Sequence, residues 1–331
     1  MNTTIADIAR SAGVAKSTVS RYLNGGSVSA KTKKKIERVI SETGYIPNSF
    51  AQSLKAKRTS MIGTIVPRLD SYATSRTLMG IDEGLREMNY QMLIANTNLN
   101  LEREIESIYD FSRRKVAGIM LLATQITPLH LKAFQEVDLP LLLIGQHYEG
   151  IHSLVHNDYE AGMKVGQYIA EMGHRKIAFL GVSEKDIAVG QVRKAGFQRA
   201  FLEVENTDIR FFETGFSMQN AFELTSRIME EFSPTVIVGA TDNIALGALK
   251  AANERGLRVP DELSITGFGG YEVTSIMHPS LTTMKYFYKD AGKEAAMHMI
   301  RLVNEKEVPL LTYSHYQLLE RDSVLNVMIK K

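Results

Sequence analysis

The chain has 331 residues, no cysteine and a formal net charge of +2 at pH 7. The length allows two or three domains. The lack of cysteine excludes disulfides and thiolate metal sites, which fits the reducing cytoplasm. No run of about 18 apolar residues could span a membrane, and the polar N-terminus lacks the apolar core of a signal peptide. We therefore expect a cytoplasmic protein without a membrane partner.

The positive charge is concentrated at one end of the chain. Residues 1–60 contain 11 Lys and Arg but only three acidic residues, so they carry +8, and residues 61–331 carry about −6. A positive field of this kind is typical of a segment that binds a polyanion such as DNA.

The first predicted element is a short helix near the N-terminus. Ile5, Ile8 and Ala9 have the spacing of one helical face. Thr4, followed three residues later by Asp7, predicts an N-terminal cap, a carboxylate variant of the capping box.

A tight turn and a second helix follow. Gly13 suits a turn between two helices. In the second helix, residues 16–23, Val19 and Leu23 face the first helix, which leaves Lys16, Ser17, Ser20 and Arg21 outward. Such side chains donate hydrogen bonds to base edges and phosphates. The alternative is an ordinary amphipathic pair with a solvated face.

The N-terminal sequence resembles the lactose-repressor family of bacterial transcription regulators. The resemblance runs through I-A-D-I-A-R-S-A-G-V-A-K-S-T-V-S-R-Y-L-N, then V-S-A-K-T, G-Y-I-P-N and A-Q-S-L, and it extends over nearly the whole chain. It implies an all-α helix-turn-helix DNA-binding domain (1–47), a hinge helix and linker (48–60) and an effector-binding and dimerisation domain (61–331). It also implies a homodimer on a pseudo-palindromic operator in double-stranded DNA.

Ser29 can cap a third helix, residues 30–43, whose apolar residues close a small three-helix core before Gly44 ends it. The lysines of 31–35 form either a solvated face or a set of phosphate contacts that carry no sequence information.

Residues 45–48 predict a turn, and 49–56 are too short for a stable isolated helix. The family resemblance implies that this hinge helix forms on the operator and inserts Leu54 into the minor groove, where an apolar wedge kinks DNA. The alternative is a linker with Leu54 packed on the following domain. The resemblance and the charge pattern together give the set of expected DNA contacts. This set is Thr4, Lys16, Ser17, Thr18, Ser20, Arg21, Asn24, Ser29, Thr32, Tyr45, Asn48, Ala51, Leu54 and Lys57.

From residue 61 the pattern changes to short apolar strands alternating with amphipathic helices. The expected strands are 62–66, 91–96, 118–123, 139–145, 153–157, 176–181, 235–240, 263–268 and 282–285, with one or two more in 310–319. The expected helices are 75–88, 101–114, 128–136, 159–172, 188–203, 217–232, 242–255 and 288–304. This rhythm indicates parallel sheets covered by helices on both faces.

The family resemblance implies that these elements form a periplasmic-binding-protein-like α/β domain of two doubly wound subdomains. The chain would cross between them near 159, 287 and 320. The N subdomain is then about 61–158 and 288–319, and the C subdomain about 159–287 and 320–331.

Ligands of open α/β sheets lie beyond the carboxyl ends of the strands, and the residues there are rich in hydroxyl, amide and carboxylate groups that suit a sugar. Arg193 matches the family's effector arginine, and a guanidinium donates to two neighbouring hydroxyls. Asp242 is either an effector contact or a plain helix N-cap, and Phe216 either lies against the sugar or packs in the core. The expected effector contacts are Tyr72, Gln146, Asp158, Arg193, Phe216, Asp242, Gly269 and Tyr286.

The sequence departs from the family pattern at three usual polar positions, occupied here by Gly145, Thr241 and the pair Gly269-Gly270. Tyr286 and Gln146 would supply the missing hydrogen bonds. The run G-F-G-G-Y-E-V followed by H-P-S-L-T-T resembles sucrose repressors of Gram-positive bacteria, which suggests sucrose or a fructose-containing relative as effector.

The sequence contains no H-E-x-x-H, P-loop or G-x-S-x-G motif, and His152 and His156 lie in a predicted loop and strand. We therefore expect no enzyme, metal or cofactor. The leading hypothesis is a dimeric repressor that a sugar releases from its operator, without the tetramerising tail of some relatives. The alternatives are corepression or activation by the same fold, a sugar-binding protein without regulatory output, and an enzyme with an accessory DNA-binding domain.

Overall fold

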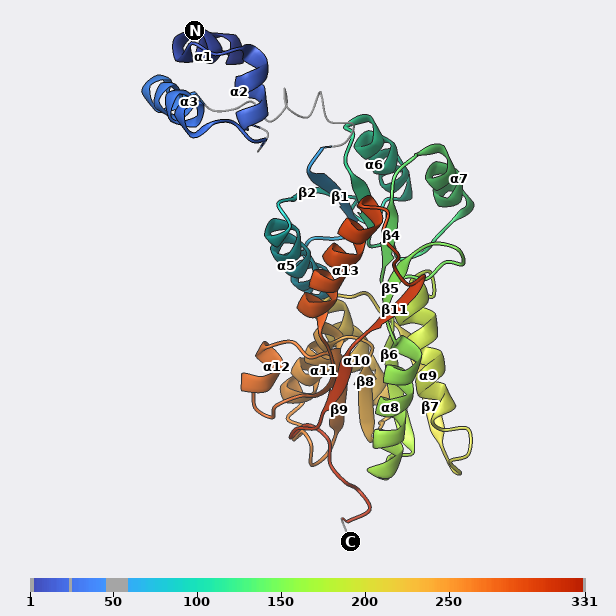
Figure 1. The fold of residues 1–331 in the computed structure, drawn as a ribbon. Coiled ribbons are helices and arrows are strands. Elements are labelled where there is room, and N and C mark those ends of the chain that lie inside the picture. Colours follow the sequence, from blue (N-terminus) through green and yellow to red (C-terminus); the bar gives the residue numbers. More distant parts are fainter. Residues whose placement is uncertain (1–2, 24–25, 46–58, 330–331) are drawn as a thin grey trace. The chain divides into compact units, whose positions relative to one another are not determined.

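The computed structural model describes residues 3–23, 26–45 and 59–329 (Figure 1). The chain divides into two compact units, residues 1–60 and 61–331, which are described separately. The expected contacts Asn24, Asn48, Ala51, Leu54 and Lys57, and the hinge helix that contains Ala51 and Leu54, lie outside the described residues.

The N-terminal unit contains α1 (Ile5–Ala12), α2 (Lys16–Leu23) and α3 (Ala30–Thr43). The predicted capping box is confirmed, because the Thr4 hydroxyl accepts from the Asp7 N–H and the Asp7 carboxylate accepts from the Thr4 N–H. Gly13 ends α1 at φ 64°, a left-handed conformation that glycine adopts without steric cost. This turn brings α2 back against α1.

The three helices share one small hydrophobic core. Its buried side chains come from all of them and are Ile8, Ala9, Ala12, Val19, Ile36 and Val39. Each helix thus buries one apolar face and leaves its polar face to solvent. Since isolated helices of eight residues are marginal in water, this core is what holds α1 and α2 in place.

Two six-stranded sheets form the described part of residues 61–331. The first has the strand order β11-β5-β4-β3-β1-β2, with all pairs parallel. The second has the order β12-β10-β9-β8-β6-β7 and is parallel except for β12, which is antiparallel to β10. The strands of the first sheet are β1 (Met61–Val66), β2 (Gln91–Asn96), β3 (Gly118–Leu121), β4 (Leu141–Ile144), β5 (Ser153–His156) and β11 (Leu311–Ser314). Those of the second are β6 (Lys176–Gly181), β7 (Asp208–Glu213), β8 (Val236–Gly239), β9 (Ser264–Gly269), β10 (Thr282–Tyr286) and β12 (Tyr316–Leu319).

Helices cover both faces of the first sheet, and separate hydrophobic clusters lie under each face. The helices on the two faces are α5 (Tyr72–Glu87) with α13 (Tyr288–Val303), and α6 (Leu101–Arg113) with α7 (Pro128–Glu136). Figure 1 shows α5 and α13 side by side, and many of their residues are in contact.

A third, larger cluster lies under the helices of the second sheet. These are α8 (Asp158–Glu171), α9 (Arg193–Arg199), α10 (Met218–Glu231) and α11 (Asp242–Glu254), with the short α12 (Val273–Ile276). The expected fold of two doubly wound subdomains is confirmed.

The sequence did not predict β7 or α12, and the expected helix 188–203 is a π-helical segment, Ile187–Val192, continued by α9. β7 lies at the sheet edge, and its burial pattern is only partly apolar. It therefore lacks the continuous apolar run of a central strand.

The chain crosses between the two sheets after β5, after β10 and after β11. The third crossing lies at His315, so its expected position near 320 is wrong. β12 (316–319) belongs to the second subdomain, because it forms an antiparallel ladder with β10 in which Tyr316 is paired with Tyr286. Tyr316 and Leu318 also pack against the second subdomain's core.

None of the helices that the structure describes is both long and apolar enough to cross a bilayer.

Candidate functional site

The polar face of α2 is open to solvent. Lys16, Ser17 and Arg21 are exposed, and Thr18 and Ser20 are half-buried. The opposite face is anchored by Val19, which is fully buried. A short basic helix held in this way presents hydrogen-bond donors outward, as a recognition helix requires.

Tyr22 adds an anchor that the sequence did not predict. It packs against the three-helix core, and its hydroxyl donates to Glu37 of α3 at 2.9 Å. The contact ties α2 to α3 and fixes which face of α2 points outward.

The other described DNA-contact candidates have structural partners. Thr4 and Ser29 cap helices, and the Ser29 hydroxyl accepts from the Thr32 N–H. Tyr45 is half-buried against the core. Their roles at DNA stay predictions.

A cavity of about 170 Å³ lies between the two subdomains of residues 61–331. This volume is small beside the roughly 300–1,000 Å³ of ligand clefts, so the two walls lie close together. Five expected effector residues line the cavity, namely Tyr72, Gln146, Asp158, Arg193 and Phe216. They come from both subdomains, so a molecule bound there would contact both.

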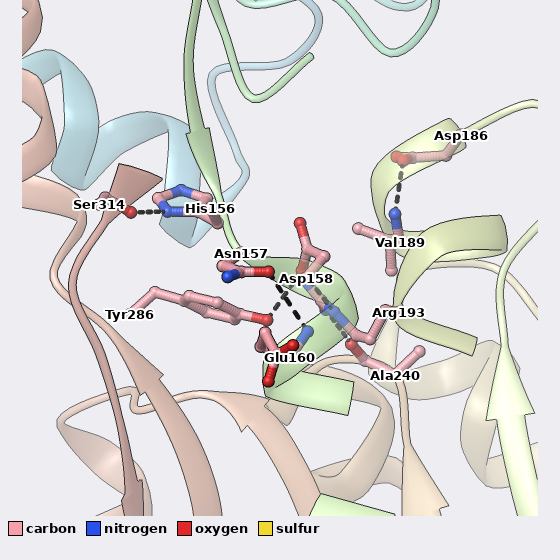
Figure 2. Close-up of polar contacts among 10 residues, drawn as sticks. All are labelled: His156, Asn157, Asp158, Glu160, Asp186, Val189, Arg193, Ala240, Tyr286 and Ser314. Atoms are coloured by element: carbon pink, nitrogen blue, oxygen red, sulfur yellow. Dashed lines mark hydrogen bonds and ion pairs between the residues drawn. The ribbon is translucent and has the colours of Figure 1, made fainter. Parts of the chain in front are cut away.

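Arg193 begins α9 and is only 4% exposed. Its Nε and Nη2 donate to Asp158 Oδ1 at 2.9 and 2.5 Å, and its Nη1 donates to the Ala240 carbonyl at 2.5 Å (Figure 2). Burial alone would lower the pKa of the Arg193 guanidinium, but the Asp158 carboxylate raises it above the ordinary value. Among the described residues, three of its five N–H groups thus have protein acceptors, which leaves two for a ligand.

Asp158 is the centre of this arrangement. Besides Arg193, its Oδ1 accepts from the Tyr286 hydroxyl at 2.8 Å, and Figure 2 shows both side chains converging on it. Asp158 begins α8, after the first crossing, and Tyr286 ends β10, before the second. The expected effector residue Tyr286 is almost fully buried and is not among the residues that line the cavity. Tyr286 therefore orients the Asp158 carboxylate through this hydrogen bond without facing the cavity itself.

His156, the last residue of β5, lies before the first crossing and contacts residues next to the other two. Its Nδ1 lies 2.5 Å from the Ser314 hydroxyl, and its ring lies 5.0 Å from that of Tyr286 and 5.1 Å from that of Tyr288. Burial lowers the pKa of His156 to about 4, so the imidazole is neutral at pH 7. The segments that connect the subdomains therefore meet at a neutral hydrogen-bonded histidine.

Asp242 does not reach the cavity, although its neighbours Thr241 and Asn243 line it. The fully buried carboxylate accepts from the Tyr271 N–H at 2.8 Å and the Thr283 hydroxyl at 2.5 Å, and burial raises its pKa to about 6. Neither interpretation of Asp242 fits this geometry. The N-cap of α11 is Thr241, whose side chain accepts from the Ile244 N–H, and Asp242 instead holds the 269–272 loop.

Gly269, another expected contact, does not line the cavity either. A Cβ at Gly269 would lie 2.3 Å from the Tyr271 ring. It is therefore the Tyr271 side chain that reaches the cavity wall from this loop.

Phe216 lies in the loop before α10 and is half-buried, with the Arg68 guanidinium 4.8 Å from its ring centre. Since it lines the cavity and also packs against the core of the second subdomain, both expected roles of Phe216 fit its position.

Several cavity residues were absent from the expected set of effector contacts. These are Arg68, Thr124, His156, Asp186, Asn243, Tyr271 and Tyr288. Arg68, Thr124 and Tyr271 follow strands, so their sequence position was informative. Nothing local marked His156 or Tyr288, since they reach the cavity only because the crossings meet there.

A wider hollow of about 610 Å³ lies on the other side of the π-helical segment, beside β6 and β7. It contains none of the expected effector residues. The smaller cavity between the subdomains is the better candidate because only there do the expected residues converge.

Comparison with protein families identifies both units. Residues 4–48 match the family described as bacterial regulatory proteins, lacI family, and residues 167–324 match a periplasmic binding protein-like domain. The first match corresponds to the helix-turn-helix. The second covers most of the second subdomain together with α13 and β11 of the first.

Known proteins resemble the chain over nearly its full length. It is 42% identical over 305 residues to the sucrose operon repressor of Staphylococcus xylosus, covering 92% of this chain and 95% of the relative. It is 30% identical over 316 residues to catabolite control protein A of Priestia megaterium, covering 93% and 95%. The lac repressor dimer bound to operator and the anti-inducer ONPF matches with a TM-score of 0.92 and 25% identity, over 98% of this chain and 100% of that one.

These relatives are transcription regulators, which confirms that the chain is a DNA-binding regulator and not an enzyme. On its helix-turn-helix, its two-subdomain fold and these matches, the chain belongs to the lacI family of bacterial transcription regulators.

Proposed function

We propose that the chain is a homodimeric cytoplasmic repressor of a carbohydrate-utilisation operon, and that sucrose or a related fructoside releases it from a pseudo-palindromic operator. One observation carries the proposal. The same chain combines an outward basic helix with a cavity whose walls come from two subdomains and bear Arg193, Asp158 and Gln146. The similarity to a sucrose operon repressor supports the choice of sugar.

On DNA, α2 would lie in the major groove of each half-site. Ser17 and Arg21 are exposed and would reach base edges, whereas Lys16 would contact phosphate. The family resemblance adds Leu54 as a wedge at the centre of the site, where it would unstack one base step. A dimer reads two half-sites only while their spacing matches the groove.

In the cavity, the sugar would bind between a polar and an aromatic wall. The two remaining N–H groups of Arg193 would donate to neighbouring hydroxyls, and Gln146 would add an amide. Tyr72 and Phe216 line the cavity with aromatic carbon atoms that would pack against the apolar side of the sugar. In ligand pockets, a small number of placed polar groups fixes the orientation of the bound molecule.

Coupling requires that the sugar bind two states of the protein unequally. Because the cavity is narrow and its walls belong to different subdomains, a bound sugar would alter how the subdomains lie against each other. In a dimer this would change the spacing of the paired hinge segments. A coupling of about 1–3 kcal/mol lowers operator affinity roughly 5–150-fold.

Fluorescence anisotropy of labelled operator DNA, selected with the protein itself, tests the proposal. The full chain is titrated with and without sucrose, with maltose and fructose as comparison sugars. We expect sucrose to weaken operator binding at least fivefold, and maltose to have a smaller effect. Tighter binding with sucrose would make the sugar a corepressor, and no response to any of the three would contradict a sugar effector of this class.

A further inference from the structure

Two tyrosines from different subdomains are stacked at the wall of the cavity. The rings of Tyr72, the first residue of α5, and Tyr271, which follows β9, have centroids 4.0 Å apart and planes inclined by 26°. Both side chains line the cavity. The stack is therefore a direct contact between the two subdomains at the place where a ligand would lie.

Charged neighbours extend this contact. The Arg76 guanidinium lies 5.2 Å from the centre of the Tyr72 ring and forms an ion pair of 2.8 Å with Glu272, the residue after Tyr271. One turn of α5 and the 269–272 loop are thus joined by a ring stack and an ion pair. Arg76 and Glu272 do not line the cavity, whereas the two rings do.

The loop is built so that the Tyr271 ring can fold back. Gly269 has φ +146°, and a Cβ there would lie 2.3 Å from the ring, so only glycine leaves the space that the ring occupies. Buried Asp242 accepts from the Tyr271 N–H at 2.8 Å, and Thr283 accepts from the Gly270 N–H at 3.3 Å. The backbone therefore holds the ring in one orientation.

Gly269 brings no side chain to this wall, and the Tyr271 ring occupies the space beside it. We propose that Tyr271 determines effector specificity: its ring, stacked on Tyr72, gives this wall of the cavity an apolar surface and selects among neutral disaccharides by the apolar C–H surface that the sugar turns toward it. The inference rests on the proposed function, since it assumes that this cavity holds the sugar. The hydrogen-bonding groups, Arg193 and Asp158 among them, lie elsewhere in the same cavity.

The first test is isothermal titration calorimetry of the full chain with sucrose and with maltose. The variants are Tyr271→Phe, which keeps the ring, Tyr271→Ala, which removes it, and Tyr313→Ala, which truncates an exposed tyrosine outside the cavity. We expect Tyr271→Ala to weaken sucrose binding at least tenfold and to reduce the sucrose-to-maltose affinity ratio at least fivefold. Tyr271→Phe and Tyr313→Ala should stay within threefold of the wild type.

Two results would overturn the specificity role. One is a Tyr271→Ala protein that binds sucrose within threefold of the wild type, and the other is an equal loss for both sugars, which is what a merely structural role produces. Thermal unfolding of each variant, measured without sugar, shows that the variant is folded.

A second test needs no sugar. In a double-mutant cycle on thermal unfolding of the full chain, Tyr72→Leu, Tyr271→Leu and the double variant are compared. If the stack exists in solution, the decrease in Tm of the double variant should be little larger than that of the more strongly affected single variant. If the two single decreases add up in the double variant, the stack is contradicted. The two tests can fail separately. If the wild type binds neither sugar but the cycle shows coupling between Tyr72 and Tyr271, then the stack exists, and both the proposed function and the specificity role are contradicted.

Discussion

Replacing Arg193 with alanine tests the effector cavity most directly, and the structure shows that the substitution has two consequences. The guanidinium is paired with Asp158 in a site where the side chains are 5% and 4% exposed. Removing it leaves a buried carboxylate with only the Tyr286 hydroxyl among the hydrogen bonds described above. Breaking a buried pair from one side costs about 3–5 kcal/mol. This is a large share of the roughly 5–15 kcal/mol that stabilises a typical domain.

The functional consequence follows from the separation of the two units. The recognition helix lies within residues 1–60, and Arg193 lies within 61–331. Arg193→Ala should therefore bind the operator normally but no longer be released by sucrose, which gives a permanently repressed operon. We expect the variant to lose the entire effect of sucrose on operator affinity, which is roughly 5–150-fold in the wild type.

The two consequences are separated by a second substitution. Adding Asp158→Asn removes the uncompensated charge, so the double variant should recover most of the free energy of unfolding without recovering the response to sucrose. Urea denaturation gives the stability, and anisotropy on operator DNA with and without sucrose gives the response. Arg258→Ala is the matched control, because this exposed arginine forms only surface ion pairs that contribute at most about 1 kcal/mol.

Two outcomes would refute the reasoning. If sucrose, or whichever sugar acts on the wild type, releases Arg193→Ala at an unchanged concentration, the cavity is not the effector site. If Arg193→Ala unfolds at the same urea concentration as Arg258→Ala, the buried pair does not stabilise the domain.

Three further predictions concern the recognition helix, the hinge and pH. Arg21→Ala should cost about 1–3 kcal/mol on the operator and less on non-specific DNA, and equal losses in a competition gel shift would make Arg21 a phosphate contact. Leu54→Ala, which rests on the family resemblance alone, should weaken operator binding and reduce the DNA bend while sugar affinity stays nearly unchanged; a bend assay that gives the wild-type angle contradicts the wedge. Burial raises the pKa of Asp242 from 3.8 to about 6, so the folded protein holds this proton more tightly than the unfolded chain, and the stability it contributes is present below about pH 4 and lost as the pH rises through 6. In the wild type, the urea midpoint of unfolding should therefore fall between pH 4 and 7, and Asp242→Asn should remove this part of the decline. If the midpoints of the two proteins change with pH in parallel, the carboxylate does not titrate in this range.

The local elements were largely predictable because their signals are local. Each of these signals involves residues within a few positions of one another. They are the Thr4–Asp7 capping box, the turn at Gly13 and the apolar residues three or four positions apart in α1 and α2. Short apolar runs separated by amphipathic stretches similarly predicted most strands of both sheets. The prediction failed where the signal is weak, at the partly apolar edge strand β7 and at the short α12.

The sequence by itself thus determined the two-unit organisation, the α/β class and the outward basic face of α2, since charge and hydrophobic periodicity are properties of neighbouring residues. Only the tertiary structure decided which strand ends form one cavity. It moved the third crossing to His315, because a ladder between β10 and β12 depends on residues about 30 positions apart. It also showed that Asp242 holds a loop while Tyr271 lines the cavity, because the burial of a carboxylate depends on packing from distant parts of the chain.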